Sequence, residues 1–214
     1  MNSAVIVAGG LGTRFGGDVP KQFIQLDGQE ILSFSVQTFL NHPQIDEVII
    51  VSHPDWLDQV VSKYPGCKIA VGGNRRQDSS TNGVKAVSSE SINILIHDAA
   101  RPFVSNKIIS NCILALETHE CVAPIIPSSD SLVKWDGKEV GFVDRTKIQI
   151  VQTPQCFNKK IITEILKSNI SGTDEIGMLL KLYPRSKVKF IQGSLDNVKI
   201  TTQNDLNYFS NAVI

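Results

Sequence analysis

The stretch Ala4 to Phe23, AVIVAGGLGTRFGGDVPKQF, places glycines and two fixed positive charges directly after a short apolar run. Glycine lets a backbone approach a ligand closely, and successive backbone N–H groups in such a turn bind anions. Arg14 and Lys21 carry the cations that usually bind phosphate. Gly12 is followed by Thr13-Arg14, so the GxxxxGK[ST] loop is excluded, and the GxGxxG fingerprint also fails. The stretch predicts a phosphate-binding turn, with a plain tight turn as the alternative.

Two further stretches combine strand ends with polar residues. GGNRRQDSSTNG, residues 72–83, follows an apolar run and opens a helix, whose N-terminus favours anions. IHDAARPF, residues 96–103, places Asp98 at the end of another apolar run, where a metal or ribose contact is expected. An ordinary capped helix remains the alternative for the first stretch. A solvated aspartate, or a structural pair between Asp98 and Arg101, remains the alternative for the second.

The remaining candidates are scattered along the second half of the chain. They comprise Asp144-Arg145, Thr153-Pro154-Gln155 and Asn197-Val198-Lys199. The inventory contains several cations and one or two acids, without a Ser-His-Asp triad or a metal-binding histidine cluster, and His97 is expected to be structural. Phosphoryl or nucleotidyl transfer needs such charge neutralisation and positioning more than a general base.

The elements that position these residues follow from hydrophobic patterning. Apolar runs predict buried parallel strands, and segments with helical spacing alternate with them, which is typical of a single α/β domain with helices on both faces of a mostly parallel sheet. Ligands bind such a sheet at the carboxyl ends of its strands. The predicted strands are residues 4–8, 47–52, 68–73, 93–100 and 121–127, and the main helices are residues 31–41, 55–64, 79–87 and 107–118.

The alternation breaks after the fifth predicted strand. Asp136-Gly137 lies between two β-prone segments, which is a strong hairpin signal. Two strands alone are marginal in water, so we expect this arm, at about residues 127–147, to be covered by a second copy of the chain. Near the end of the chain, Thr202 or Asn204 is expected to cap a last helix.

Composition narrows the class of protein. The 214 residues carry no net formal charge, which disfavours a broad nucleic-acid surface. The apolar run near the start is too short for a signal peptide, and no window approaches the roughly 20 apolar residues of a membrane helix. The four cysteines match no metal pattern and no disulfide framework, and Cys112 and Cys121 are expected to be buried. We therefore expect a cytoplasmic protein that binds neither membrane nor nucleic acid.

The motifs, in their order along the chain, resemble the 2-C-methyl-D-erythritol 4-phosphate cytidylyltransferases and the related ribitol-5-phosphate cytidylyltransferases. The resemblance runs nearly end to end, and the ordered set is highly specific. HDAARP and the spacing of VDR before QTPQ favour the methylerythritol branch. AGG in place of PAAG is closer to the ribitol branch, Asn74 stands where an acid is common, and Ser131 replaces the usual threonine. The motifs are AGGLGTRFG with PKQF, GGNRRQDS, HDAARPF, SDSLVK…VDR, QTPQ, TDE and DNVKITT.

The resemblance implies a Rossmann-like nucleotidyltransferase domain that joins CTP to a polyol phosphate with Mg²⁺ and works as a homodimer through its arm. CTP would be held by Ala8, Gly9, Gly10, Gly12, Gly73, Arg76, Ser79, Asp98, Ala99 and Arg101. Arg14 and Lys21 would neutralise charge on the α-phosphate and the leaving pyrophosphate, and Asp98 would place the ribose or Mg²⁺. The polyol phosphate would be gripped by Ser131, Arg145, Thr153 and Lys199, with Arg145 reaching across from the partner.

Two readings compete with this one. A nucleotidyltransferase acting on a hexose 1-phosphate would use the same phosphate chemistry with a different nucleotide. A non-catalytic nucleotide sensor could keep the fold, but binding alone rarely needs two charges aimed at one leaving group.

Overall fold

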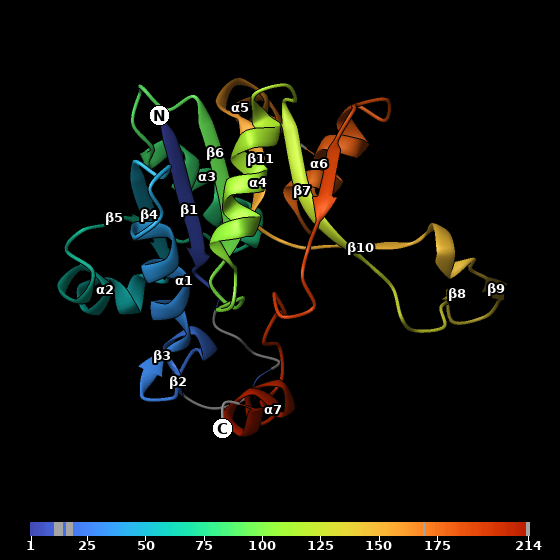
Figure 1. Ribbon diagram of the computed structural model, residues 1–214, viewed down its shortest axis with the longest axis horizontal. Helices are drawn as coiled ribbons and strands as arrows, with labels where there is room; N and C mark the ends of the chain where they lie inside the picture. Colours follow the sequence, from blue (N-terminus) through green and yellow to red (C-terminus); the bar gives the residue numbers. More distant parts are fainter. Residues whose placement is uncertain (11–14, 16–18, 169, 213–214) are drawn as a thin grey trace.

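A computed structural model describes residues 1–10, 15, 19–168 and 170–212 of the chain. An eight-stranded mixed sheet forms its centre, in the order β10-β7-β11-β6-β1-β4-β5, with β12 paired to β7 (Figure 1). The strands β1, β4, β5 and β6 are parallel neighbours, and β12 is parallel to β7. The predicted α/β class with a mostly parallel sheet is confirmed. The sheet strands are β1 (Asn2–Ala8), β4 (Glu47–Ser52), β5 (Lys68–Val71), β6 (Asn93–Asp98), β7 (Cys121–Pro127), β10 (Gln149–Val151), β11 (Gln155–Asn158) and β12 (Lys189–Gln192).

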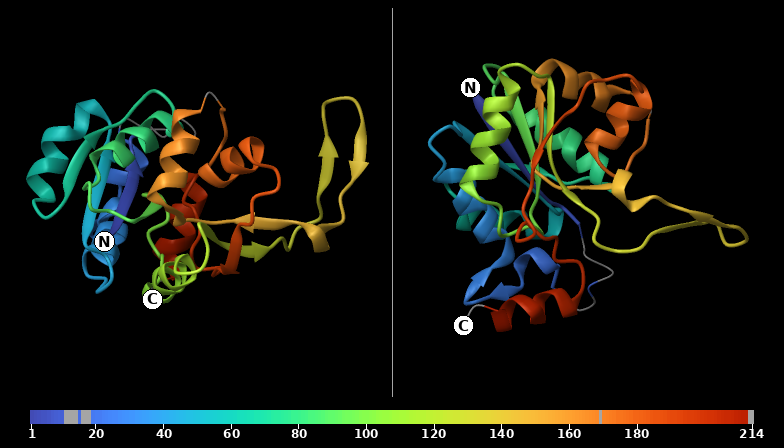
Figure 2. Two further views of the ribbon diagram at one scale, coloured as in Figure 1. Left: turned by 90° about the horizontal axis from the view of Figure 1, so that it is seen from above. Right: turned by 45° about the vertical axis from the view of Figure 1, so that its right-hand side comes forward.

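Helices cover both faces of this sheet, as Figures 1 and 2 show. Alternate residues of β1 belong to two hydrophobic cores, one on each face of the sheet. Ala4 and Ile6 share a core with residues of α1, α2 and α4. Val5 shares the other core with residues of α3, α5 and α6. The period-two alternation of strand side chains therefore supplies both cores from one buried strand. The helices are α1 (Ile31–Leu40), α2 (Leu57–Lys63), α3 (Arg76–Ala86), α4 (Asn106–Leu116), α5 (Lys159–Lys167), α6 (Glu175–Leu182) and α7 (Gln203–Ala212).

Several predicted boundaries were wrong by two or three residues. The strand expected over residues 93–100 ends at Asp98, and the helix expected over residues 79–87 begins at Arg76. The earlier end of the strand lengthens the loop after Asp98, whereas the earlier start of α3 shortens the loop before it and makes Arg76 its first residue, at the carboxyl edge of the sheet. Thr202 caps α7, because its hydroxyl accepts a hydrogen bond from the backbone N–H of Asp205 at 3.3 Å, whereas Asn204 lies inside the helix.

The predicted arm is present and projects from the body of the molecule (Figures 1 and 2). Its strands β8 (Val133–Trp135) and β9 (Val140–Phe142) pair antiparallel on either side of the Asp136-Gly137 turn. Gly137 has φ +97°, which a glycine adopts without strain, and the Asp136 carboxylate accepts backbone hydrogen bonds across the turn. A second small pair, β2 (Gln25–Leu26) with β3 (Gln29–Glu30), lies beside α7.

The cysteines and the hydrophobicity of the helices can be compared with what the composition predicted. All four cysteines are free, Cys112 and Cys121 are buried as predicted, and Cys156 is buried as well. Within the described ranges, the structure contains no helix that is long and apolar enough to cross a membrane.

Candidate active site

The main cavity, of about 530 Å³, lies at the carboxyl edge of β1, β5 and β6. It collects residues that are far apart in the sequence, as the strand-end argument predicted. Asp98 is the single acidic side chain among the described residues that line it. The predicted site residues on its wall are Ala8, Gly9, Gly10, Lys21, Gly73, Arg76, Ser79, Asp98, Ala99 and Lys199. Two predicted residues of the opening stretch, Gly12 and Arg14, lie outside the described residues.

Two backbone turns meet at the floor of this cavity. A Cβ added to Gly9 would lie 3.3 Å from the Cα of Gly72 and 3.0 Å from the Ser79 hydroxyl. The Ser79 hydroxyl accepts a hydrogen bond from the N–H of Gly73 at 3.0 Å, which ties the loop after β5 to α3. A side chain at position 9 would therefore crowd the Gly72 backbone and the Ser79 hydroxyl where the two turns approach each other.

Gln22 lines the main cavity and was not singled out from the sequence. Its side-chain amide is 3% exposed and donates to the carbonyl oxygens of Ala8 at 2.6 Å and Gly10 at 2.9 Å. It thus fixes the start of the glycine turn from the neighbouring 3-10 helix Lys21–Phe23. In the sequence, its place in the PKQF motif was the one signal that could have pointed to Gln22.

Asp98 is surrounded by three cations. Its Oδ1 accepts from Nε of Arg76 at 3.1 Å, its Oδ2 accepts from Nζ of Lys199 at 2.7 Å, and Nε of Arg101 lies 3.8 Å from Oδ2. Burial alone would raise the pKa of Asp98, but these positive charges hold it far below its ordinary value. Asp98 is therefore an ionised anchor that arranges cations at the cavity wall.

Arg76 is committed to two carboxylates. Its Nη1 donates to both oxygens of Glu175, at 2.7 and 2.8 Å, while its Nε donates to Asp98. Burial alone would lower the pKa of Arg76, but Asp98 and Glu175 raise it above the ordinary value. Glu175 was quoted only as part of the TDE motif, and the sequence assigned it no role.

A hydrogen-bonded chain behind the cavity supports the loop that carries Asp98. The carbonyl of Arg101 can only accept, so His97 donates to it from Nε2 at 3.0 Å, and Nδ1 accepts from the Thr153 hydroxyl at 3.0 Å. The Thr153 oxygen in turn accepts from the backbone N–H of Asp98 at 3.1 Å. Burial lowers the pKa of His97 to about 4, in keeping with a neutral structural histidine. Thr153, expected to grip a phosphate, is 3% exposed and supports this loop from behind.

A second cavity, of about 520 Å³, adjoins the first through Lys199, which lines both. Arg101 lies on its wall and donates to the carbonyl of Asn197 at 2.7 Å. Ile126, Ile150 and Val198 add apolar surface beside these charges. The two cavities therefore offer a site for an anionic, partly apolar second ligand next to the glycine turn.

Comparison with known proteins identifies this arrangement. The sequence model of the family 2-C-methyl-D-erythritol 4-phosphate cytidylyltransferase matches residues 2–213. The chain belongs to this family. Among similar proteins is the 2-C-methyl-D-erythritol 4-phosphate cytidylyltransferase of Clostridium botulinum strain 657, which is 40% identical over 96% of this chain and 94% of its own length. The protein of that name from Clostridioides difficile strain 630 is 36% identical over 97% and 91%.

Solved structures of the family share the fold. The 4-diphosphocytidyl-2C-methyl-D-erythritol synthase of Anaerococcus prevotii aligns with a TM-score of 0.87 at 29% identity, over 99% of this chain and 95% of that one. The Thermus thermophilus cytidylyltransferase aligns with a TM-score of 0.80 at 26% identity, over 97% and 96%. These findings confirm the resemblance and favour its methylerythritol branch over the ribitol alternative.

In this cytidylyltransferase, the two site residues predicted on the arm lie away from the chain's own cavities. Ser131 and Arg145 are exposed, and Arg145 donates to the carbonyl of Ser129 at 2.8 Å within the arm. The arm extends away from the strand edge that carries the cavities (Figure 2). Among the described residues, one chain brings most of the predicted CTP-side residues together with Lys199 in the first cavity and places Arg101 on the second, but it brings neither Ser131 nor Arg145 to them.

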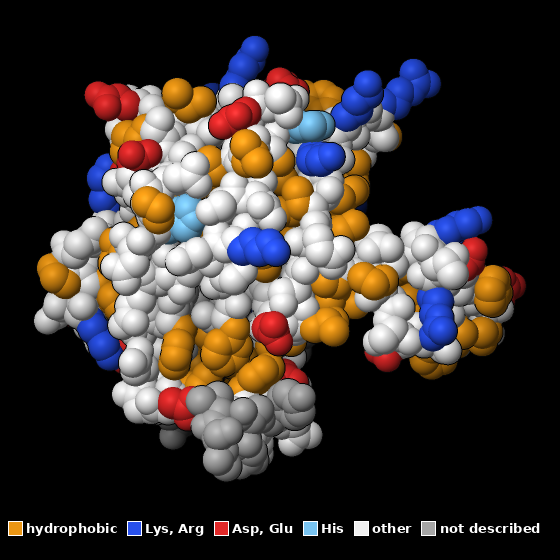
Figure 3. All heavy atoms as spheres, in the orientation of Figure 1, with side chains coloured by type: hydrophobic (Ala, Val, Ile, Leu, Met, Phe, Trp, Pro, Cys, Tyr) orange, Lys and Arg blue, Asp and Glu red, His pale blue; other side chains and the backbone are white. Residues whose placement is uncertain are grey.

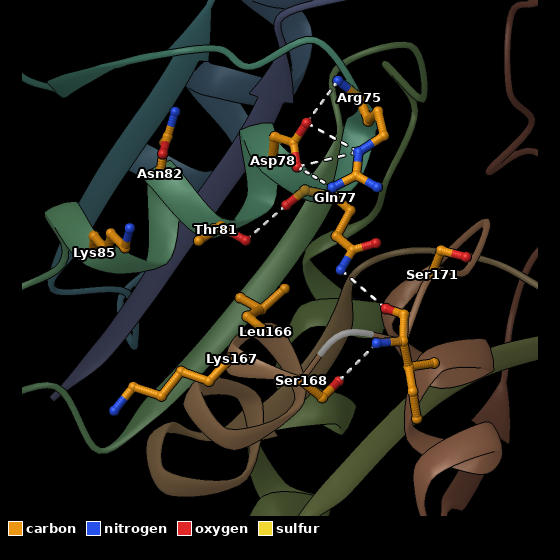
Figure 4. Close-up of a pocket in the computed structure, with 11 residues that line it drawn as sticks. Arg75, Gln77, Asp78, Thr81, Asn82, Lys85, Leu166, Lys167, Ser168 and Ser171 are labelled. Atoms are coloured by element: carbon orange, nitrogen blue, oxygen red, sulfur yellow. Dashed lines mark hydrogen bonds and ion pairs between the residues drawn. The ribbon is translucent and has the colours of Figure 1, made fainter.

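The outer side of α3 carries a polar hollow of about 450 Å³ between α3 and the segment after α5 (Figure 4). Its side chains are held by local contacts: Arg75 pairs with Asp78, and Gln77 donates to the backbone carbonyl of Ile170 at 3.0 Å. Helix α3 thus presents Arg76 and Ser79 to the main cavity while its outer side is tied to the segment that leads into α6.

Proposed function

We propose that the protein transfers the cytidylyl group of CTP to 2-C-methyl-D-erythritol 4-phosphate, forming the CDP-polyol and pyrophosphate. The observation that carries the proposal is the pair of cavities that meet at Lys199, one floored by glycine backbone and the other lined by Arg101. Family membership supplies the identity of the two substrates. The first cavity suits a nucleotide, and the second suits an acceptor that carries a phosphate and a methyl-bearing polyol.

The residues support an in-line displacement. An oxygen of the acceptor phosphate attacks the α-phosphorus of CTP, the bond from that phosphorus to the bridging oxygen breaks, and pyrophosphate leaves with the electron pair. The acceptor phosphate is already ionised at neutral pH, so no protein base is needed. Lys21 on the cavity wall, with Arg14 as predicted, neutralises the charge that develops on the leaving group.

Magnesium fits this site as part of the substrate. In the described part of the chain, no three histidine, cysteine, aspartate or glutamate side chains are grouped to hold a metal ion. Mg²⁺ is commonly bound by one or two carboxylates together with substrate phosphates, and Asp98 is the carboxylate at hand. When bound with CTP, Mg²⁺ would be held mainly by the triphosphate and would neutralise its charge, with Asp98 beside it holding Arg76 and Lys199.

A second copy of the chain would complete the site. The arm exposes Val133, Trp135, Val140 and Phe142, which form an orange patch on the projecting segment in Figure 3. Val133 lies opposite Phe142, and Trp135 lies opposite Val140. Because opposite residues and alternate residues of a strand share a face, all four lie on one face of the hairpin. We infer that this face packs on a partner and that Arg145 thereby reaches the partner's acceptor cavity.

The test is an assay of the purified protein with CTP, Mg²⁺ and each polyol phosphate in turn, with pyrophosphate release as the readout. We expect turnover with 2-C-methyl-D-erythritol 4-phosphate. Release with ribitol 5-phosphate alone would reject the proposal in favour of the ribitol reading. Faster turnover with UTP or GTP than with CTP would reject the assigned nucleotide.

A further inference from the structure

Glu175, the first residue of α6, is a charged side chain with no exposed surface. Its carboxylate accepts two hydrogen bonds from Arg76 and one from the Ser80 hydroxyl at 2.7 Å. A buried charge is tolerated when it is paired and fully hydrogen-bonded, and these contacts meet that condition. Its position behind the cavity places a buried negative charge next to Arg76.

The contacts of Glu175 continue to the reacting end of the site. Arg76 joins Glu175 to Oδ1 of Asp98, and Oδ2 of Asp98 holds Lys199. The four side chains alternate in charge from α6 to the junction of the two cavities. Because Glu175 holds Nη1, Arg76 approaches Asp98 from its other edge and leaves Oδ2 to Lys199.

The start of α6 is anchored by other contacts as well. Gln155 accepts from the N–H of Ile176 at 2.9 Å and donates to Asp174 at 2.6 Å. On the outer side of α3, Gln77 holds the carbonyl of Ile170 (Figure 4). These bonds do not use the Glu175 charge, so an isosteric Glu175→Gln change should keep α6 in place.

We propose that Glu175 is a positioning residue, which acts through Arg76 and Asp98 to hold Lys199 at the junction of the two cavities. The inference rests on the proposed function, because it assigns Lys199 to the reaction centre. Without the Glu175 charge, Arg76 and Lys199 compete for a single carboxylate. Arg76 then closes on both oxygens of Asp98, since a bidentate arginine–carboxylate pair is the stronger arrangement, and Lys199 loses its anchor.

The positioning role of Glu175 can be distinguished experimentally from the cytosine contact that the resemblance implies for Arg76. A residue that holds the base would affect CTP binding, and its loss would raise KM for CTP. A residue that positions Lys199 would affect the chemical step while CTP still binds. The split between kcat and KM therefore distinguishes the two.

The experiment compares Glu175→Gln, Arg76→Gln and the double variant in steady-state assays, with calorimetric binding of CTP and Mg²⁺. We expect Glu175→Gln to lower kcat by about 30-fold, the loss typical of a charged hydrogen-bond partner, with KM and Kd for CTP within about threefold. The double variant should lose no more than Arg76→Gln alone, because both changes break one chain. Three outcomes would overturn the proposal. The double variant could lose the product of the two single losses in kcat. Glu175→Gln could leave kcat unchanged, or could raise KM for CTP as much as it lowers kcat.

The control is Glu47→Gln, which neutralises another hydrogen-bonded carboxylate at the opposite end of the sheet. It should lower the melting temperature while kcat stays within about twofold. If Glu175→Gln does not fold, Ser80→Ala provides the milder test, since Ser80 touches Glu175 and is itself fully buried. We expect Ser80→Ala to lower kcat about threefold at constant KM for CTP, and an unchanged kcat would count against the proposal.

A readout independent of turnover comes from a crystal structure of Glu175→Gln. Lys199 should lie beyond hydrogen-bond distance of Asp98, with Arg76 on both carboxylate oxygens. An unchanged contact between Lys199 and Asp98 would overturn the proposal whatever the kinetics. Failure of the wild type with every polyol phosphate would instead reject the proposed function, so the two failures are distinguishable.

Discussion

At the scale of single residues, the Thr153 hydroxyl stabilises the wall of the site from behind. Replacing it by the isosteric Val leaves His97 Nδ1 without a donor and the Asp98 N–H without an acceptor. Buried groups that lose their partners cost about 1–3 kcal/mol, so we expect Thr153→Val to lower the free energy of unfolding by about 2 kcal/mol. Urea denaturation measures this loss.

The matched control is Thr38→Val. The Thr38 hydroxyl donates to the carbonyl of Phe34 one helical turn earlier, and that carbonyl keeps its backbone bond when the hydroxyl is removed. We expect a change within about 0.5 kcal/mol. Equal losses of unfolding free energy in the two variants would show that the hydrogen bonds that link Arg101 to Asp98 through His97 and Thr153 add nothing to stability.

At the scale of elements, α3 packs so closely on the sheet that Gly83 leaves no room for a side chain. An added Cβ would lie 2.4 Å from Val5 Cγ1 and 2.7 Å from Val51 Cγ2. In an open helix Gly→Ala gains about 1 kcal/mol, but overpacking a core costs about 1–3 kcal/mol and the branched valines are stiff. We therefore expect Gly83→Ala to lower stability in urea denaturation, whereas Lys85→Ala on the exposed side of α3 should not. A more stable Gly83→Ala protein would contradict this packing.

Glu47, at the start of β4, ties several segments together at the amino edge of the sheet. Burial alone would raise the pKa of Glu47, but hydrogen bonds from Lys68, Ser3, Ser88 and Ser91 lower it from 4.5 to about 2. A carboxyl with a depressed folded pKa contributes stability that is present above pH 4.5 and lost as the pH falls toward 2. We expect the difference in unfolding free energy between wild type and Glu47→Gln to be largest near neutrality and to shrink on acidification. A constant difference in urea titrations across this range would refute the assignment.

The elements also show what sequence reasoning can reach. Strands buried on both faces, such as β1 and β4, are continuous apolar runs that are visible in isolation. Strand β11 was missed because its place in the sheet depends on antiparallel pairing with β6 and β7, which lie far from it in the sequence. Gly9, Gly10 and Lys21, which line the main cavity, were predictable from their types and spacing. Gln22 and Glu175 were not, because their partners are carbonyls and a guanidinium that only the folded chain brings near.

At the scale of the whole molecule, the arm exposes more apolar surface than a free hairpin tolerates. Phe142 is 90% exposed and Trp135 is 70% exposed. We expect Phe142→Asp to convert a dimer into folded monomers in sedimentation analysis, because the side chain contributes little to the monomer and a charge is costly in an apolar interface. Lys138→Ala, at the exposed tip of the same hairpin, should leave the dimer intact. A dimer that persists with Asp at position 142 would show that the arm does not make the interface.

The proposed dimer makes a sharper prediction about shared sites. If each site uses Lys21 of one chain and Arg145 of the other, Arg145→Ala and Lys21→Ala homodimers are both inactive. A heterodimer of the two variants, isolated by different affinity tags, contains one intact site and one doubly damaged site. We expect it to recover about half of the wild-type activity, since the intact site retains every charged partner of the transferring phosphate.

The control pairs the Arg145→Ala chain with a chain that carries both substitutions. No site in that heterodimer has both side chains, so it should stay inactive under either arrangement of the arm. Absence of recovery in the first heterodimer would assign Arg145 to its own chain's site. That outcome would require the arm to fold back by a long path, because Arg145 is held within it by the carbonyl of Ser129. Recovery is therefore what the geometry of the projecting arm predicts.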